Sequence, residues 1–292
     1  MNMIEYSDIW YTSADGLRLY ARDYANQQKP NTATILCMHG LTRNSADFEE
    51  ICNALAGRYR VIAVDQRGRG LSAYDPEPAN YNPLVYIQDM FLLLQTLNLS
   101  KVILMGTSMG GIMAMMMAAM KPELVQALII NDIGPEVGVK GLDRLKKYVG
   151  KSTPVSSWEE AAKQSAAINR IAFPNADYEY WQNFAKRTYQ ESENGTPVVA
   201  YDPNIAVPLN EANNDTAAPD LWPVYDQVSN KPMLLIRGEH SDILEPACVE
   251  KMKQKKSDLE VKVVPEIGHA PMLNEPVARS AIESFLSRLT AS

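Results

Sequence analysis

The feature that most constrains how this chain folds is the pentapeptide Gly106-Thr107-Ser108-Met109-Gly110, which directly follows an apolar run at residues 102–105. A buried strand that leads into G-x-S-x-G and then into a helix is typical of a sharp elbow that holds its serine in a strained conformation with the hydroxyl exposed. The flanking glycines are needed because side chains there would collide with the crossing strand and helix. The sequence therefore predicts a strand, a turn with Ser108 at its apex, and a helix.

Further apolar runs of four to eight residues recur along the chain, mostly separated by amphipathic stretches. We expect a hairpin from residues 8–11 and 17–23, joined through Asp15-Gly16, and strands at 34–38, 60–64, 101–105, 125–130, 232–236 and 260–264. This alternation predicts an α/β fold with a mostly parallel central sheet flanked by helices. In such sheets ligands bind outside the carboxyl ends of the strands, and each candidate site residue below lies at one of those ends.

The strand rhythm stops between about residues 135 and 226, where helical patterns at 141–149, 158–172 and 178–190 precede a stretch rich in Asn and Pro. A long insertion that leaves one strand and returns to feed another is typical of a cap over the site, and surface helices that merely fill a long connection are the alternative. We therefore expect a core of residues 1–135 and 227–292, with a helical cap at residues 136–226.

Composition limits the classes of partner and the cellular compartments that we expect for this chain. The net charge of −7 and a pI near 5.1 argue against nucleic acid and anionic membrane surfaces as partners. The first ten residues lack the apolar core of a signal peptide, and the longest apolar stretch after the elbow is about half of what a membrane span needs. The three cysteines, Cys37, Cys52 and Cys248, lack metal-ligand spacing and suit a reducing compartment. We expect a cytoplasmic protein that acts on a small molecule.

A serine hydroxyl becomes a good nucleophile only when a base takes its proton and a third group orients that base. The chain has only three histidines, so the base for Ser108 can be chosen by elimination. His39 directly follows a strand and is better suited to shaping a loop, and His240 is expected to face solvent or support its own loop. His269 follows the last strand, where a loop would bring its imidazole over the elbow, so we predict that it is the base.

Two carboxylates are candidates for the orienting group. Asp242 follows the penultimate strand and gives the chain order Ser, Asp, His, so it is preferred. Asp132 follows the strand after the elbow helix and is the alternative acid; otherwise it would anchor a loop or cap a helix. Glu239 is a weaker third candidate because its position nearer the strand should point it elsewhere.

A tetrahedral intermediate at this serine would need backbone N–H donors aimed at its oxyanion. Met109, the residue after the serine, would supply one N–H from the start of its helix. Leu41 would supply the other from the loop after the strand that contains Cys37, with Gly40 permitting the turn.

Taken together, five segments resemble the α/β-hydrolase superfamily, in the branch with a serine nucleophile and a helical cap. The segments are residues 39–44 (HGLTRN), 65–72 (DQRGRGLS), 106–111 (GTSMGG), 238–242 (GEHSD) and 268–269 (GH). The resemblance implies a cofactor-free hydrolase without a metal, similar to esterases, enol-lactonases and meta-cleavage product hydrolases. In that family residues 65–72 form a structural turn, so Arg67 and Arg69 are expected in a solvated, salt-bridged turn and have no catalytic role.

These observations predict a serine hydrolase that cleaves a small carboxylic ester or lactone through an acyl-enzyme on Ser108. C–C bond hydrolysis of a ring-fission product by the same residues is an alternative, in which Arg43, Arg67 and Arg69 would be the side chains placed to grip a carboxylate. A protein that only binds a small molecule under its cap is a further alternative.

Overall fold

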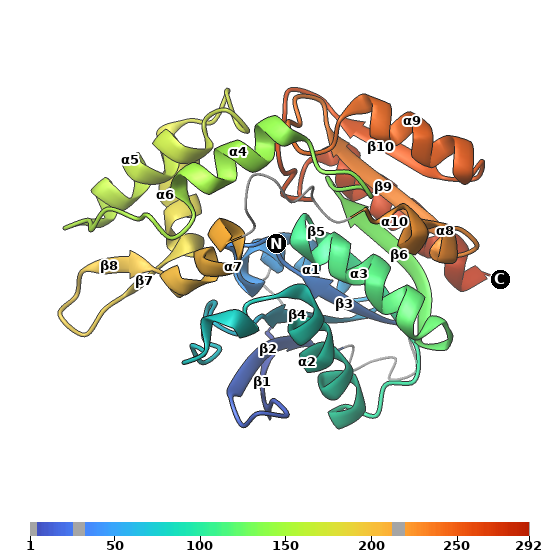
Figure 1. Ribbon diagram of the computed structural model, residues 1–292, viewed down its shortest axis with the longest axis horizontal. Helices are drawn as coiled ribbons and strands as arrows, with labels where there is room; N and C mark the ends of the chain where they lie inside the picture. Colours follow the sequence, from blue (N-terminus) through green and yellow to red (C-terminus); the bar gives the residue numbers. More distant parts are fainter. Residues whose placement is uncertain (1–4, 26–32, 212–219, 292) are drawn as a thin grey trace.

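The computed structural model describes residues 5–25, 33–211 and 220–291. Its centre is an eight-stranded sheet in the order β1-β2-β4-β3-β5-β6-β9-β10 (Figure 1). The strands are β1 (Ser7–Thr12), β2 (Arg18–Tyr24), β3 (Thr34–Met38), β4 (Arg60–Asp65), β5 (Val102–Thr107), β6 (Val125–Asn131), β9 (Met233–Gly238) and β10 (Glu260–Val264). Only β2 runs antiparallel to its neighbours β1 and β4. The predicted α/β fold with a mostly parallel sheet is confirmed.

Helices cover both faces of this sheet. The buried side chains of α1 (Glu49–Leu55) and α10 (Pro276–Ala291) share one core layer. Those of α2 (Pro83–Thr96), α3 (Met109–Met120), α8 (Trp222–Val228) and α9 (Pro246–Lys255) share the other. Short 3-10 helices are η1 (Ser45–Phe48), η2 (Pro78–Asn80), η3 (Pro122–Leu124) and η4 (Pro203–Ile205). Central strands such as β3 are buried along their whole length, because alternate side chains enter opposite layers.

The junction of β5 and α3 forms the sharp elbow that the sequence predicted. Ser108 has a φ of 53° and a ψ of −117°, a conformation that side chains rarely adopt. A Cβ added at Gly106 would lie 2.1 Å from the carbonyl oxygen of Gly110, and one added at Gly110 would lie 2.0 Å from the carbonyl oxygen of Met38. Because both obstacles are backbone atoms, these positions admit only glycine.

The segment between β6 and α8 is mainly helical and lies to one side of the sheet (Figure 1). It contains α4 (Val139–Tyr148), α5 (Trp158–Asn169), α6 (Tyr178–Thr188), the hairpin β7 (Tyr189–Glu191) and β8 (Pro197–Val199), and α7 (Ala206–Glu211). Its own small core includes Trp181 and Phe184. Helix α8, which crosses the expected boundary at residue 226, contributes Trp222 and Tyr225 to the core layer of α3.

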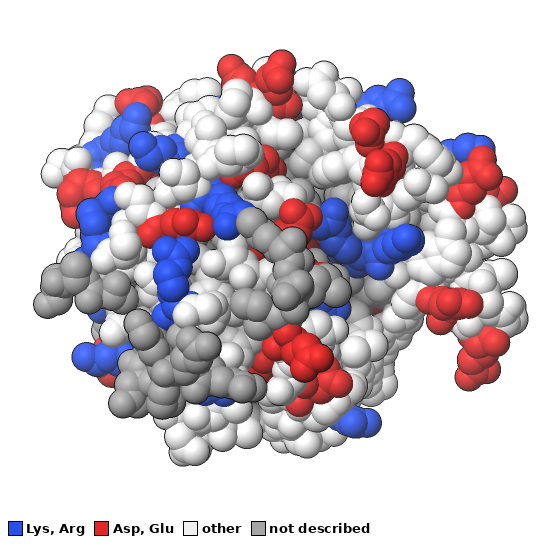
Figure 2. Space-filling model, turned by 180° about the vertical axis from the view of Figure 1, so that it is seen from behind, with Lys and Arg blue, Asp and Glu red and all other residues white. Residues whose placement is uncertain are grey.

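Charges of both signs are mixed over the face seen in Figure 2, where many of the basic side chains lie beside acidic ones. Within the described residues, no helix combines the length and the apolar character that crossing a membrane would require.

The elbow yields a stability prediction. Gly110→Ala should lower the free energy of unfolding by roughly 3 kcal/mol or more, since its methyl group would overlap the Met38 carbonyl and only a backbone shift could relieve this. Urea unfolding followed by circular dichroism measures the change. Gly57→Ala is the matched control, because a Cβ there meets no atom within 4 Å. Equal effects of the two substitutions would contradict the steric argument.

Candidate active site

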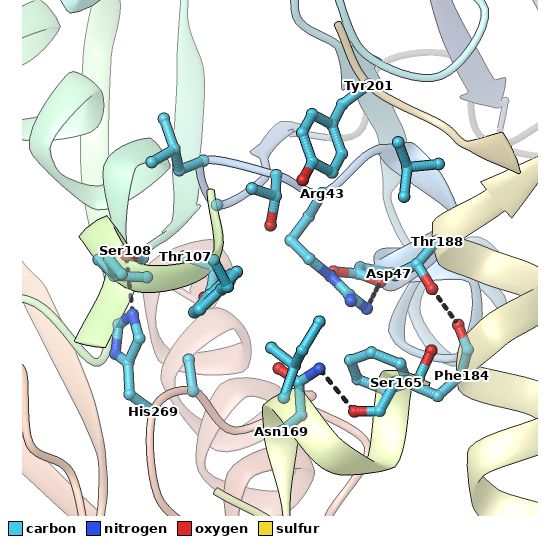
Figure 3. A pocket seen from close by; sticks show the side chains of 18 of the residues that line it. Arg43, Asp47, Thr107, Ser108, Ser165, Asn169, Phe184, Thr188, Tyr201 and His269 are labelled. Atoms are coloured by element: carbon cyan, nitrogen blue, oxygen red, sulfur yellow. Dashed lines mark hydrogen bonds and ion pairs between the residues drawn. The ribbon is translucent and has the colours of Figure 1, made fainter. Parts of the chain in front are cut away.

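Ser108 lies at the amino end of α3, at the carboxyl edge of the sheet. Its N–H donates to the carbonyl oxygen of Asn131 at 2.9 Å, which holds the elbow against the end of β6. Its Oγ lies 2.9 Å from Nε2 of His269, the histidine selected from the sequence (Figure 3). The structure thus brings together the two residues expected to act as nucleophile and base, although 161 positions separate them in the chain.

Asp132 completes a continuous row of hydrogen bonds. Its Oδ2 lies 2.8 Å from Nδ1 of His269. The same carboxylate is fully buried and accepts from the N–H of Gly238 at 2.8 Å and the hydroxyl of Ser241 at 2.6 Å. Its backbone has a φ of 58°, and its N–H donates to the carbonyl oxygen of Ile236 on β9. These contacts fix the carboxylate, and through it the orientation of the imidazole.

The carboxylate within hydrogen-bond distance of His269 is that of Asp132, the alternative acid, and not that of Asp242, the preferred one. Asp242 instead forms a two-pronged ion pair with Arg144 of α4, with Nε–Oδ2 and Nη2–Oδ1 distances of 2.7 and 2.8 Å. Partial burial opposes ionisation of Asp242, but the Arg144 hydrogen bonds and charge, helped by His269, hold the pKa of this carboxyl below its ordinary value. The Asp242 carboxylate is therefore already committed to a cation from the inserted segment.

Met109 and the loop that carries Leu41, the two expected sources of oxyanion N–H donors, both border the cavity region around Ser108. Met109 is the first residue of α3, so its N–H has no acceptor within the helix. A Cβ added at Gly40 would lie 3.7 Å from the Ser108 Cβ, so the loop that continues into Leu41 passes beside the serine. Arg69 donates from Nε to the Leu41 carbonyl oxygen at 2.9 Å and so supports this loop. No pattern around Arg69 in the sequence signals this supporting role.

His39 and His240 are excluded from the row by their positions. His240 is exposed. His39 is fully buried, accepts from the N–H of Gln66 through Nε2 at 3.0 Å, and contacts the Gly40 carbonyl oxygen through Nδ1 at 2.7 Å. It therefore braces the loop, as its place after β3 suggested.

The turn at residues 65–72 is salt-bridged but buried, whereas a solvated turn was expected. Arg67 forms ion pairs with three carboxylates, those of Asp15, Asp75 and Asp89. Both Arg67 and Arg69 are 2% exposed or less, and neither lines the cavity beside Ser108. Of the three arginines considered as contacts for a carboxylate, only Arg43 reaches that cavity.

A cavity of about 300 Å³ opens beside Ser108 and His269. Its walls come from the core and from the inserted segment, and Figure 3 shows the side chains that converge on it. Apolar wall residues include Leu145, Ile168, Phe173, Phe184, Val199 and Met272. Polar ones include Arg43, Asp47, Tyr148, Ser165, Asn169 and Tyr201. Its size suits a small molecule. In residues 5–25, 33–211 and 220–291, no three His, Cys, Asp or Glu side chains are grouped to hold a metal ion.

The burial of His39 gives a pH-dependent prediction. Burial lowers its pKa to about 3 despite its contact with the Gly40 carbonyl oxygen. Because the unfolded chain would bind this proton near pH 6.5, stability due to His39 falls as the pH drops from about 6.5 towards 3, by up to about 1.4 kcal/mol per pH unit. The free energy of unfolding should therefore fall more between pH 7.5 and 5.5 for the wild type than for His39→Gln. An NMR titration midpoint for His39 above pH 5.5 would contradict this.

Comparison with known proteins places this geometry in a family. A family model described as "alpha/beta hydrolase fold" matches residues 33–276. A 3-hydroxybutyrate-oligomer hydrolase of Cupriavidus necator is 30% identical over 263 residues, which cover 88% of this chain and 89% of that protein. A 2-(acetamidomethylene)succinate hydrolase of Mesorhizobium japonicum is 31% identical over 261 residues, covering 89% and 90%.

Solved structures agree with this. An alpha/beta hydrolase from Novosphingobium aromaticivorans superposes with a TM-score of 0.91 at 38% identity, covering 98% of this chain and all of that one. The structure of an E-2-(acetamidomethylene)succinate hydrolase superposes with a TM-score of 0.81 at 28% identity, covering 97% and 100%. The chain therefore belongs to the alpha/beta hydrolase fold family.

Proposed function

We propose that this hydrolase cleaves a small carboxylic ester or lactone through an acyl-enzyme on Ser108. The observation that carries the proposal is the continuous row from the Ser108 hydroxyl through His269 to the buried Asp132, at the wall of a cavity that suits a small molecule. A protein that only binds its ligand would have no need for a serine held in this strained conformation against an imidazole.

The proposed reaction proceeds in two halves. Nε2 of His269 takes the proton from the Ser108 hydroxyl as its oxygen attacks the acyl carbon, and Asp132 stabilises the imidazolium that forms. The N–H groups of Met109 and Leu41 hold the oxyanion. The imidazolium then protonates the leaving alcohol, and a water activated by the same His269 releases the acid and restores Ser108.

We further propose that residues 136–211, the described part of the insertion before α8, act as a cap that selects the substrate. Helices α4, α5 and α6 supply cavity walls that include Leu145, Ile168 and Phe184, whereas the core supplies Ser108 and His269. Chemistry and selection would then reside in different segments of the chain. The relatives named for 3-hydroxybutyrate oligomers and for 2-(acetamidomethylene)succinate favour small acyl compounds as substrates.

The state of the cysteines supports a proposal about the compartment. Cys37, Cys52 and Cys248 are free and buried. Three unpaired thiols suit a reducing environment, so we propose that the protein acts in the cytoplasm. We also propose that it needs no cofactor, because the two-step mechanism above uses only side chains, backbone N–H groups and water.

Ser108→Ala tests the nucleophile. Hydrolysis of p-nitrophenyl esters from acetate to decanoate should fall by about a thousandfold or more, because no acyl-enzyme can form. An organophosphonate should label the wild type at Ser108, detected by mass spectrometry, and leave the variant unlabelled. Labelling without ester turnover would direct the search to lactones and ring-fission products. Undiminished hydrolysis by the variant would refute the mechanism.

A pair of carboxylate variants tests which acid orients His269. Asp132→Asn should lower kcat by about a thousandfold to ten-thousandfold, because an amide in place of the carboxylate no longer holds the required tautomer or stabilises the imidazolium. Asp242→Asn should lower kcat by less than about tenfold, since Asp242 contacts Arg144 and not His269. The reverse order of the two effects would show that Asp242 is the acid after all.

A further inference from the structure

Arg43 enters the cavity from the loop that also carries Leu41 (Figure 3). A Cβ added at Gly40 would lie 3.6 Å from the Arg43 Cγ and 3.7 Å from the Ser108 Cβ. Both side chains therefore start from neighbouring points of the wall. A substrate group only a few bonds from the attacked carbonyl could reach the guanidinium.

The guanidinium is held in one orientation. Asp47 accepts from its Nε at 2.6 Å and from its Nη2 at 2.5 Å, and the Phe184 ring centroid lies 4.1 Å from its Cζ. This arrangement uses one edge of the planar group and one face. Nη1 of Arg43 has no acceptor within the described residues, and the side chain is 16% exposed, so donors remain for a ligand.

The charge of the wall favours an anion next to this free edge. Among the described side chains that line the cavity, the permanent cations are Arg43 and Lys151, and the carboxylate is that of Asp47. Both oxygens of Asp47 already accept hydrogen bonds from Arg43. Because Arg43 is oriented before a ligand arrives, a carboxylate would bind it with little further ordering.

We propose that Arg43 is the specificity-determining residue of this cavity and that the substrate is a short ester bearing a free carboxylate, recognised by the Nη1 edge of Arg43. This inference rests on the proposed function, because it concerns the same cavity. It specifies an ester of a hydroxy acid, whose alcohol portion ends in the carboxylate.

A dimer of a 3-hydroxy acid has this form, since its carboxylate lies four bonds from the ester carbonyl carbon. The relatives from Cupriavidus necator and Mesorhizobium japonicum are both named for carboxylate-bearing compounds. Residue Arg43 and its pairing with Asp47 and Phe184 are properties of this chain, and they provide a physical reason for such a preference here.

The test compares the linear dimer of 3-hydroxybutyrate with its methyl ester, which keeps the internal ester and lacks the charge, and it follows cleavage of the internal ester alone. Wild-type kcat/KM should be at least tenfold higher for the acid. Arg43→Gln should lower kcat/KM for the acid by tenfold to a hundredfold, mainly by raising KM, and change it for the methyl ester by less than threefold. Arg58→Gln, which removes an arginine that is also paired with a carboxylate but lies outside the cavity wall, should change kcat/KM for either substrate by less than threefold.

Arg43→Gln leaves Asp47 without its partner, so a second variant separates lost recognition from a new repulsion. Arg43→Gln/Asp47→Asn removes both charges and should lose the same preference for the acid. Preference for the acid retained by either variant would overturn the proposal, as would equal kcat/KM for the two substrates in the wild type.

A binding measurement keeps the two proposals distinguishable. Calorimetric titration of the dimer and of its methyl ester into Ser108→Ala requires no turnover, and the acid should bind at least tenfold more tightly. Adding Arg43→Gln to Ser108→Ala should abolish the difference. Tight binding of the acid by a wild type that hydrolyses no ester would refute the proposed function and leave the carboxylate site standing. Hydrolysis of p-nitrophenyl acetate without preferential binding of the acid would refute only the role of Arg43.

Discussion

The arrangement of the site depends on the hydrogen bonds of one buried carboxylate, that of Asp132. It sits at the end of β6, accepts hydrogen bonds from Gly238 and Ser241 after the neighbouring strand β9, and orients His269 from the last loop. A carboxylate removed from water is stable only when such donors surround it. The end of β6, the loop after β9 and the loop that carries His269 are thus held together by one carboxylate. This arrangement positions His269 within hydrogen-bond distance of Ser108.

Ser108 depends on a second constraint, which is steric. Gly106 and Gly110 let the chain reverse within van der Waals contact of β3 and α3, and this reversal presents the serine at the sheet edge. The hydrogen bond to Asp132 therefore positions His269, and the close packing at these glycines positions Ser108 beside it. The cavity opens beside these two residues, and both the core and the inserted segment contribute to its walls.

Most of the fold and part of the site could be predicted from the sequence, because apolar runs and turn residues indicate local structure directly. The strands, the hairpin at Gly16, the elbow at Ser108 and the loop with His269 all follow from such patterns. The choice between Asp132 and Asp242 as the partner of His269 could not be made from such patterns. Both follow strands that are neighbours in the sheet, so both are within reach of His269. The positive φ of Asp132 and the approach of Arg144 from α4, 98 positions away from Asp242, decide between them, and neither leaves a local signal.

The surroundings of Arg67 were hidden for a related reason. Its charge and its place in a glycine-containing turn suggested exposure, yet the turn is covered by the inserted segment. The N–H of Gly70 donates to the Ala200 carbonyl oxygen, and the N–H of Asp202 donates to the Gly68 carbonyl oxygen. The hydropathy pattern of a segment indicates its own secondary structure and its own buried face. It carries no information about a distant segment that covers a loop.

The inserted segment is thus fastened to the core near both of its ends. Arg144 holds Asp242 at the start, with the N–H of Gly141 donating to the Asp242 carbonyl oxygen, and Ala200 and Asp202 hold the 65–72 turn near the end. The stretch between these attachments walls the cavity but supplies none of the three residues in the hydrogen-bonded row. Mutational drift in that stretch would alter which molecules fit while the reactive groups keep their positions. With this architecture, substrate range would evolve while the reaction mechanism stays the same.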